Sequence, residues 1–392
     1  MAKEKYNLIQ ELTKRSEMLT NEDRLALVGQ GDFPGANNVM RSTMNIKHHT
    51  QHLTIDNPEF PMFYDGKENV SGHHSKFYIQ AKKPYRVDKI IKKYDKLLNG
   101  KSKFALYFLH CEEDDSWELL ERKEVENLTQ NFGFDYNTDY VDDLEEGDVI
   151  PAGTTMLSST SYDEYGNTGI GVNGRIMYAV HPAVVEDAII VSESFAKRLV
   201  TNNVKLVSIP VSDNTILLNL YGTKDDYKGL PDIGTKIKDG IVAATRTIKE
   251  GRMFSDLRDS SLSMTNDQND VKYYDIGMGE VIDIDIYCNN PDLEYNKVNK
   301  QIYQYYKDCR WFYTDVYKEC KKILNSSSND IDNNINYWMK KAQDYLNDDE
   351  SWTIHDDIYS NVFINILIRS KEEARVGRKI VGEAVIANIK VG

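Results

Sequence analysis

The sequence predicts an α+β protein of mainly β character, with an antiparallel helical hairpin inserted into it. Short apolar runs rich in β-branched residues, such as 188–191 and 362–368, have the length and composition of strands. Glycines adjoin several of these runs and supply the positive φ that tight turns need. Between residues 293 and 350 the apolar residues instead recur every three or four positions, which is the helical period.

The composition limits the class of protein. The 392-residue chain has a formal net charge of −14, whereas a protein that grips DNA by itself is usually basic. Any contact with nucleic acid must therefore come from a local basic patch. The four cysteines form no CxxC pair, which favours buried free thiols over disulfides or a zinc ribbon. The sequence has no apolar run long enough for a membrane span and no signal peptide, so we expect a cytoplasmic protein with no membrane partner.

A pair of acids stands directly before the strand predicted at 188–191. Glu186 and Asp187 are adjacent, so on an extended chain only one of them points straight at a given site. The continuous apolar run predicts a strand buried on both faces, and Ser192 is a good N-cap for a short helix at 195–200. The acids either serve a cation site, such as Mg²⁺ on nucleotide phosphates, or form a structural pair with amides or a basic residue.

Two segments carry candidate phosphate-binding side chains. The first follows a glycine- and proline-rich loop at 29–35, a place where functional side chains often lie. The second follows the strand at 362–368 and is the densest basic patch in this acidic chain. A solvated helix face is the alternative interpretation of the first segment. The residues are Asn37, Asn38, Arg41 and Lys47 in the first segment, and Arg369, Lys371, Arg375, Arg378 and Lys379 in the second.

Two other groups of residues have the spacing of metal ligands. His48 and His52 would share one helix face, but no further ligand stands at a suitable distance in the sequence, so we expect no zinc there. Asp283 and Asp285 lie on the same face of the strand predicted at 281–287. A half-buried strand with a solvated face explains them better than a metal site.

Local patterns predict the other elements. A surface helix is expected at 4–19, a second helix at 87–98 from its apolar spacing, and a strand at 104–109. Gly147 and Gly240 each stand between a polar pair and an apolar strand, a repeat that is typical of compact β barrels and of turns with positive φ.

Glycines and helical spacing predict the remaining features. Gly166, Gly169, Gly171 and Gly174 lack the order of a phosphate-binding loop, so we interpret them as places where the backbone approaches a neighbouring segment. The apolar positions at 298–323 and 331–345 follow the helical period and are joined by a short polar turn, which predicts the hairpin.

These features occur in the order found in one known family. The segment at 175–200 resembles the Glu-Asp strand and helix of the β subunit of multisubunit DNA-directed RNA polymerases, the second-largest subunit of the archaeal and eukaryotic enzymes. Residues 33–53 resemble the family's Asn/Arg segment beside the active centre, and 142–153 and 234–244 resemble its two glycine-turn hairpins. Residues 256–287 resemble its Arg-Asp-x-Ser-Leu stretch and the strand that follows, and 362–382 resemble its last strand with a Val-Gly-x-Lys turn.

The resemblance implies a domain organisation. It implies part of a double-psi β barrel and a flap-like β module, in addition to the helical hairpin. The expected parts are an N-terminal helix and active-centre loop segment at 1–57, a lineage-specific α/β segment at 58–139, barrel parts at 140–204 and 355–392, the flap-like module at 205–292, and the hairpin at 293–350.

The resemblance also implies a function. It implies a β-subunit fragment, as in the split-subunit polymerases of large bacteriophages, that takes part in phosphodiester formation from nucleoside triphosphates. The primary Mg²⁺ is then held by another chain, while Glu186 and Asp187 are catalytic and Asp187 is a transient ligand of the second Mg²⁺. Asn37, Asn38, Arg41, Lys47, Arg375, Arg378 and Lys379 become contacts to nucleotide and nucleic acid.

The implied partners follow from that function. They are other β-type and β′-type polymerase chains, a promoter-recognition factor, template DNA and the RNA transcript. A phage origin places the protein in the host cytoplasm.

The chain departs from the family at two places. The family's arginine near Asn37 and Asn38 is missing, and Arg41 stands one helical turn further on. The family's His-Gly-Asn-Lys-Gly motif, with its substrate-contacting lysine, does not follow Gly382, and Lys390 has the wrong spacing to replace it.

These departures lead to one expectation and leave alternatives open. Missing barrel strands predict unpaired edges at 362–368 and 385–389, which a second polypeptide completes while it supplies the lysine. A non-catalytic assembly or binding module of such a complex is the main alternative. A stand-alone metal hydrolase built on His48 and His52 is a more distant one.

Overall fold

The computed structural model describes most of the chain from residue 78 onward and a few residues before it. The described residues are 38, 40–41, 43–44, 53–60, 62, 78–129, 132–163, 167, 169, 171–180, 182, 188–211, 215–223, 226–237, 239–247, 270–275, 279–288, 300–326, 330–347, 362–381 and 384–390. They form eighteen strands and four helices, which confirms the α+β class with mainly β character. The predicted helix at 4–19 and the residues Asn37, Lys47, His48, His52, Gly166, Glu186 and Asp187 lie outside this set.

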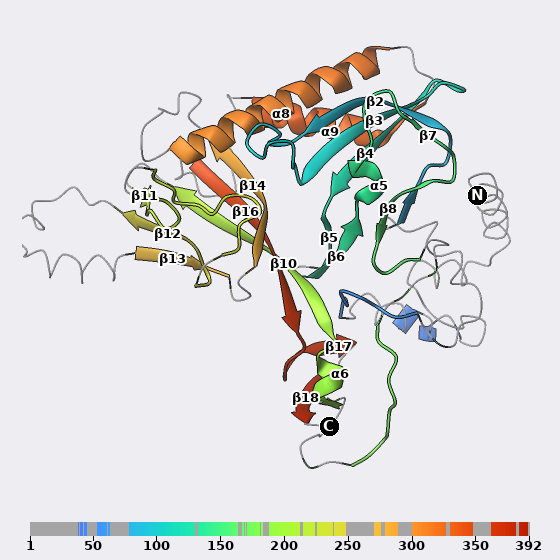
Figure 1. The fold of residues 1–392 in the computed structure, drawn as a ribbon, viewed down its shortest axis with the longest axis vertical. Helices are drawn as coiled ribbons and strands as arrows, with labels where there is room; N and C mark the ends of the chain where they lie inside the picture. The colour runs from blue at the N-terminus through green and yellow to red at the C-terminus, as the bar shows by residue number, and fades with distance from the viewer. Residues whose placement is uncertain are drawn as a thin grey trace, which may run out of the picture.

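A seven-stranded sheet shaped as a half-barrel forms the centre of the protein (Figure 1). Its strand order is β1-β8-β6-β10-β16-β14, and β5 pairs with β6. β10 and β16 pair antiparallel over twelve residues each, and this long pair reaches from the body into the lower part of the molecule. The strands are β1 Tyr78–Gln80, β5 Val125–Thr129, β6 Phe132–Asn137, β8 Thr155–Ser159, β10 Val200–Val211, β14 Glu280–Cys288 and β16 Val362–Glu373.

The strands predicted at 362–368 and 385–389 exist, but the prediction of unpaired edges was wrong for both. β16 lies between β10 and β14, and its side chains alternate between buried and half-buried over most of its length. The second strand, β18 (Ala384–Lys390), lies between β17 (Lys379–Val381) and β9 (Ala188–Ser192). The pairing partners are far away in the sequence, so the apolar pattern of a single strand could not reveal them.

A five-stranded sheet in the order β15-β4-β3-β2-β7 packs above the half-barrel (Figure 1). β3 confirms the strand predicted at 104–109, and it is buried on both faces. The strands are β2 Tyr85–Lys92, β3 Phe104–Cys111, β4 Ser116–Lys123, β7 Val149–Ile150 and β15 Asp330–Ile331.

The helix predicted at 87–98 was wrong, because its first part is the strand β2. A bulge shifts the register between Val87, which pairs with Leu109, and Lys89, which pairs with Phe108. Val87 and Ile90 therefore pack into the same core, whereas Ile91 packs into the core on the other face of the sheet. The bulge produces a three-residue spacing within a strand, and that spacing has the helical period.

The segment expected as α/β at 58–139 is therefore a β segment in the part that the structure describes. Strands β1 to β6 follow one another from residue 78 to residue 137, and turns connect them. The next element is the short helix α5, Asp139–Asp142.

The helical hairpin is confirmed as α8 (Lys300–Asn325) and α9 (Asn333–Leu346). It docks onto the two main sheets, because Phe312 of α8 contacts the ring of Phe104 in β3 and the Tyr345 hydroxyl of α9 donates to the Ile286 carbonyl in β14. The buried positions match the predicted helical spacing. They are Ile302, Tyr305, Cys309, Phe312, Val316, Cys320 and Ile323 in α8, and Ile335, Trp338, Ala342 and Tyr345 in α9.

The glycine turns agree with the sequence analysis. Gly147 and Gly240 have φ of +100° and +69°, the left-handed region that favours glycine. Gly240 precedes β12 of a small sheet in the order β11-β12-β13, within the segment expected to be flap-like. Gly169 and Gly174 mark close approaches, since a Cβ would lie 3.2 Å from the Glu59 carbonyl oxygen and 2.6 Å from the Phe195 ring. The small sheet contains β11 Thr215–Leu217, β12 Ile241–Thr247 and β13 Asp270–Tyr274.

Candidate functional site

Three segments that are far apart in the sequence meet in the lower part of the molecule. We call this part the C-terminal module and define it as residues 53–60, 188–201 and 370–390. The Leu53 N–H donates to the Ile380 carbonyl (2.6 Å), and the Asp56 N–H donates to the Val200 carbonyl (2.8 Å). Leu53, Ile55, Val191, Ala196, Leu199, Ala374 and Ile386 form its own small core.

The strand that follows the acid pair lies at the edge of this module. β9 begins at Ala188, directly after Asp187, and pairs in parallel with β18 from Ala188↔Val385 to Ser192↔Lys390. The prediction of a strand buried on both faces was wrong, because only Val191 is buried. Among the described residues β9 is the edge strand of the three-stranded sheet β17-β18-β9, so one of its sides has no neighbouring strand there.

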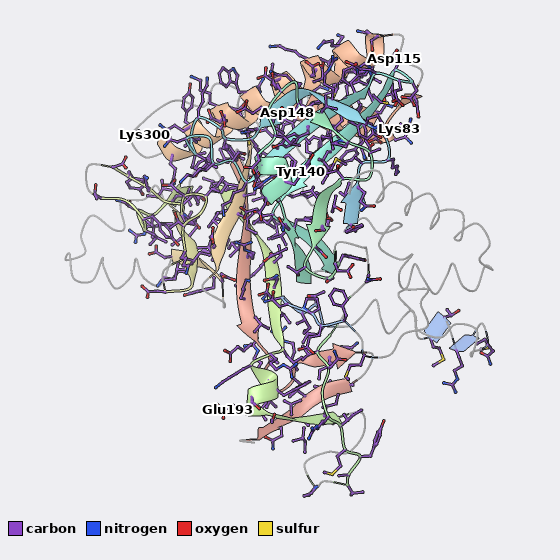
Figure 2. All side chains as sticks on the ribbon, turned by 45° about the vertical axis from the view of Figure 1, so that its right-hand side comes forward. Lys83, Asp115, Tyr140, Asp148, Glu193 and Lys300 are labelled. Atoms are coloured by element: carbon purple, nitrogen blue, oxygen red, sulfur yellow. The ribbon has the colours of Figure 1, made fainter. Side chains whose placement is uncertain are left out.

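The predicted cap and helix after β9 are present, although the helix is short. α6 covers Glu193–Ala196, and the Ser192 hydroxyl accepts from the Phe195 N–H at 3.2 Å. Glu193 marks this module in Figure 2. The path of the chain therefore places Glu186 and Asp187 immediately before the module in sequence, while their own positions lie outside the described residues.

The basic side chains of the turn after β16 differ in how far they are exposed. The Arg378 side chain is 13% exposed and forms an ion pair with Glu372. Arg375 is 64% exposed and lies 3.8 Å from the same carboxylate, and Lys379 is also exposed. Arg375 and Lys379 are thus the two cations of this turn that an external phosphate reaches most easily.

The two basic residues within β16 hold the fold together. Arg369 lies 3.5 Å from Asp135 and between 3.7 and 3.8 Å from Glu280 and Glu124. Lys371 Nζ is 2.7 Å from the Asp56 carboxylate, and so ties β16 to the segment at 53–60. Burial raises the pKa of Asp135, and Arg369 offsets part of that shift. These acids come from distant parts of the chain, so the sequence pattern alone overstated the basic patch.

The N-terminal candidate residues lie apart from this module where the structure describes them. Asn38 caps a helical fragment by accepting from the Arg41 N–H at 2.9 Å, and the Arg41 side chain is exposed. The fragment is drawn in blue, away from the C-terminal module, in Figures 1 and 2. The helical fragment at 40–44 is therefore not brought against the basic turn at 375–379.

An exposed apolar segment precedes the acid pair and was missed by the sequence analysis. Ile176, Met177, Tyr178 and Val180 are between 84% and 104% exposed. The segment has no strand partner among the described residues, although it precedes β9 in the sequence. Contiguous exposed apolar side chains of this size mark interaction surfaces. The run of apolar residues at 176–180 was visible in the sequence, but its exposure was not.

The two aspartates of β14 lie on a half-buried face, as expected, but a buried lysine is paired with both of them. Lys93 Nζ lies 2.8 Å from Asp283 and 2.6 Å from Asp285, and its side chain is only 5% exposed. Burial would lower the pKa of Lys93, but the two carboxylates outweigh it and hold that pKa well above its ordinary value. Tyr94 and α8 cover the cluster, since the Tyr94 hydroxyl contacts Cys309 Sγ at 2.7 Å. The cluster is an internal ion pair that connects the two main sheets.

The described residues show neither a metal-binding cluster nor a membrane-spanning helix. The described residues contain no group of three or more histidine, cysteine, aspartate or glutamate side chains arranged to hold a metal ion. No helix among them is long and apolar enough to cross a membrane. Comparison of the sequence with models of known protein families and with curated proteins gives no match.

Proposed function

We propose that this chain is a β-type subunit fragment of a multisubunit DNA-dependent RNA polymerase, a nucleotidyltransferase that works only as a complex. Its C-terminal module would lie on the nucleotide side of the active centre and beside the RNA–DNA hybrid. One observation supports this most strongly. The strand after the acid pair and the basic turn after β16, nearly two hundred residues apart, form one module with the segment at 53–60.

The proposal assigns a role to each group of side chains. Carboxylate oxygens are suitable ligands for Mg²⁺, so Asp187 would hold the second Mg²⁺ that arrives with the nucleotide, with Glu186 beside it. That ion would supply positive charge to the triphosphate, and the primary Mg²⁺ would be held by another chain. Arg375 and Lys379 would contact backbone phosphates of the hybrid.

The proposal also includes the finer architecture. The C-terminal module and part of the half-barrel would belong to a double-psi β barrel, and the sheet β11-β12-β13 to a flap-like module. A second polypeptide would complete the barrel and bring a substrate-binding lysine close to Glu186 and Asp187. The nearly complete exposure of residues 176–180 supports a protein partner at this place.

A non-catalytic assembly module of such a complex is the second candidate function. It is favoured by the engagement of Arg369, Lys371 and Arg378 with acids of the same chain, which leaves fewer cations for nucleic acid. The two candidates predict the same partners and differ in the effect of removing the acid pair.

The substitution Asp187→Ala in the assembled enzyme tests the catalytic proposal. We expect nucleotide addition to slow by about ten- to a hundredfold, as is usual when a group that supports a metal ion is lost, and the Mg²⁺ requirement to rise. Assembly should be unchanged, as judged by copurification of the chains. Glu193→Ala, an exposed acid just beyond β9, is the matched control and should retain the parent rate. An unchanged elongation rate at limiting Mg²⁺ would leave only the assembly role.

A further inference from the structure

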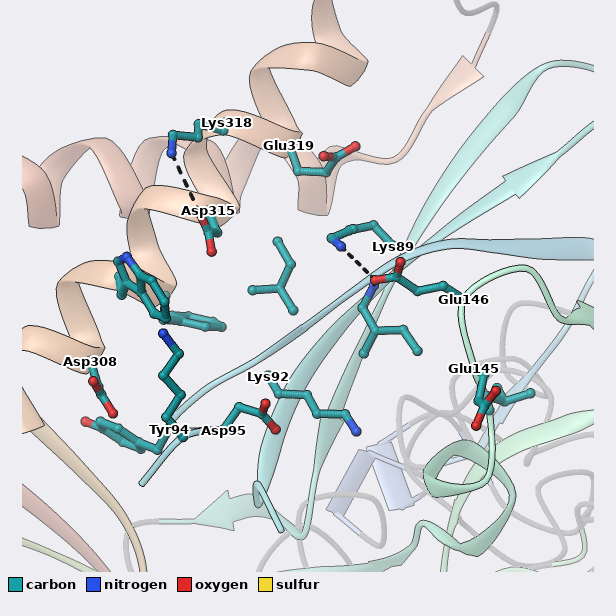
Figure 3. A pocket seen from close by; sticks show the side chains of 16 residues that line it. Lys89, Lys92, Tyr94, Asp95, Glu145, Glu146, Asp308, Asp315, Lys318 and Glu319 are labelled. Atoms are coloured by element: carbon teal, nitrogen blue, oxygen red, sulfur yellow. Dashed lines mark hydrogen bonds and ion pairs between the residues drawn. The ribbon is translucent and has the colours of Figure 1, made fainter. Parts of the chain in front are cut away.

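A groove on the opposite side of the protein from the C-terminal module has the chemistry of a cation site. It has a volume of about 700 Å³ and lies between β2 with its following turn, the outer face of α8, and the turn before β7 (Figure 3). We call it the Trp311 groove. Six carboxylates and four lysines line it, together with apolar side chains, so its lining carries an excess of negative charge.

The indole of Trp311 belongs to the α8 wall of the groove. Its side chain is half exposed, and Lys96 Nζ lies 3.1 Å from the centre of its ring. Asp308 stands one helical turn before Trp311 on α8, and Asp315 one turn after it, so carboxylates flank the aromatic face. Figure 3 shows both aspartates on the α8 wall of the groove. An aromatic face next to carboxylates is the combination that binds ammonium and guanidinium groups.

The charges of the groove are only partly satisfied by the chain itself. Lys89 forms an ion pair with Glu146 at 2.8 Å on one wall, and Lys318 lies 3.8 Å from Asp315 on the other. Asp308 is half-buried and makes no hydrogen bond or ion pair with the residues that the structure describes. Burial raises the pKa of Asp308, although Lys96 and Lys307 oppose that shift. The free-energy cost of removing the Asp308 carboxylate from water is therefore already part of folding. A cation that binds beside Asp308 does not add that cost again.

We propose that the Trp311 groove binds a basic segment of another polypeptide, whose lysine or arginine replaces Lys96 over the indole and pairs with Asp308. The negative lining disfavours nucleic acid phosphates. The apolar floor, which includes Ile91 and Phe312, suits a peptide with apolar side chains next to its basic ones. Lys96, which comes from an exposed turn, is the chain's own occupant of this cation position.

The direct test uses the full chain and a fluorescently labelled peptide of alternating leucines and arginines, with a glutamate-for-arginine peptide as control. We expect saturable binding of the arginine peptide alone. Trp311→Ala and Asp308→Asn should each weaken that binding by about tenfold, the size expected for a lost cation–π contact or charge-assisted hydrogen bond. Asp344→Asn and Tyr337→Ala, which alter exposed residues of α9 outside the groove, should leave it unchanged.

A second variant separates the groove from general attraction between charges. Lys96→Met removes the internal competitor and should tighten binding by several-fold, more than Lys101→Met, which removes an equal charge from the same turn outside the groove. Equal effects of the two lysine variants, or unchanged binding in Asp308→Asn, would overturn the proposal. Displacement of the peptide by spermidine at an equal concentration would identify a polyamine site instead. None of these results depends on polymerase activity.

Discussion

At the scale of single residues, Lys93 shows how far a local pattern can mislead about charge. Asp283 and Asp285 alternate with apolar residues, as on any half-buried strand. The structure places one buried ammonium between them, from a turn almost two hundred residues earlier. The two carboxylates are 24% and 29% exposed, so water can hydrate them only in part if the lysine is lost.

Replacement of Lys93 by methionine should therefore lower the free energy of unfolding by about 3 kcal/mol, because it leaves two carboxylates facing each other without a cation. Urea denaturation followed by circular dichroism measures the change. Lys89→Met, which removes an exposed lysine paired with Glu146, is the matched control and should cost less than about 1 kcal/mol. The triple variant with Asp283→Asn and Asp285→Asn should recover most of the loss. A triple variant as unstable as Lys93→Met would contradict this account.

The pH dependence of the same variant gives an independent check. Burial raises the pKa of Asp283, so the folded state binds that proton more tightly than the unfolded state. The contribution of Asp283 to stability therefore increases as the pH falls. Loss of Lys93 raises this pKa further, so the deficit of Lys93→Met should shrink between about pH 7 and pH 5. A stability loss of Lys93→Met that grows as the pH falls would contradict this explanation.

At the scale of elements, the turn between β16 and β17 carries one mostly buried arginine, Arg378, and two exposed basic residues, Arg375 and Lys379. Gly377, with φ of +85°, donates to the Ile386 carbonyl and fixes the turn against β18. Arg378 pairs with Glu372 on the inner side, whereas Arg375 and Lys379 remain exposed. The turn can thus present two cations on a rigid base, which is what a phosphate contact needs.

The double variant Arg375→Ala, Lys379→Ala tests this division in the assembled complex. Each phosphate contact contributes about 0.9 to the slope of log affinity against log salt, so the slope should fall by about two. Sequence preference should not change, because these contacts carry no base information. Arg378→Ala is the comparison: it should lower thermal stability through its lost pair with Glu372 and keep the parent slope. A salt titration of the double variant that matches the parent would show that both residues face solvent.

At the scale of the whole molecule, the long β10–β16 pair connects an upper body with large hydrophobic cores to the C-terminal module, whose core is small. The upper body has cores between the two main sheets and under α8 and α9. The C-terminal module has a much smaller core, and β9 is an edge strand within the described sheet. The exposed residues 176–180 precede that edge strand in the sequence, and we expect another chain to bind there.

The isolated chain should accordingly be poorly soluble, and coexpression with the second polypeptide that we propose completes the barrel should rescue it. Ile176→Asp with Tyr178→Asp should improve the solubility of the isolated chain and prevent assembly. Val149→Asp, at another exposed apolar position, should do neither. Size-exclusion chromatography of each sample measures both properties. A parent chain that is a monodisperse monomer with cooperative unfolding, or a double variant that still assembles, would refute this arrangement.

Much of the fold was predictable from local sequence patterns, whereas the candidate site was predictable only in part. The strands β3, β14 and β16 and the buried faces of α8 and α9 follow from periodicity. The N-cap at Ser192 and the positive φ of Gly147 depend on a few neighbouring residues, and both were foreseen. The sequence also indicated the basic turn after β16 and the strand after the acid pair.

The tertiary structure alone decided the features that depend on distant partners. The bulge in β2 arises in its pairing with β3. It lets apolar residues at helical spacing share one face of a strand. Lys371 and Arg369 became structural because Asp56 and Asp135, which are distant in the sequence, reach them in the folded chain. Local propensity and spacing act over one or two turns of chain, whereas strand pairing, burial and ion pairing are set by residues that only folding brings together.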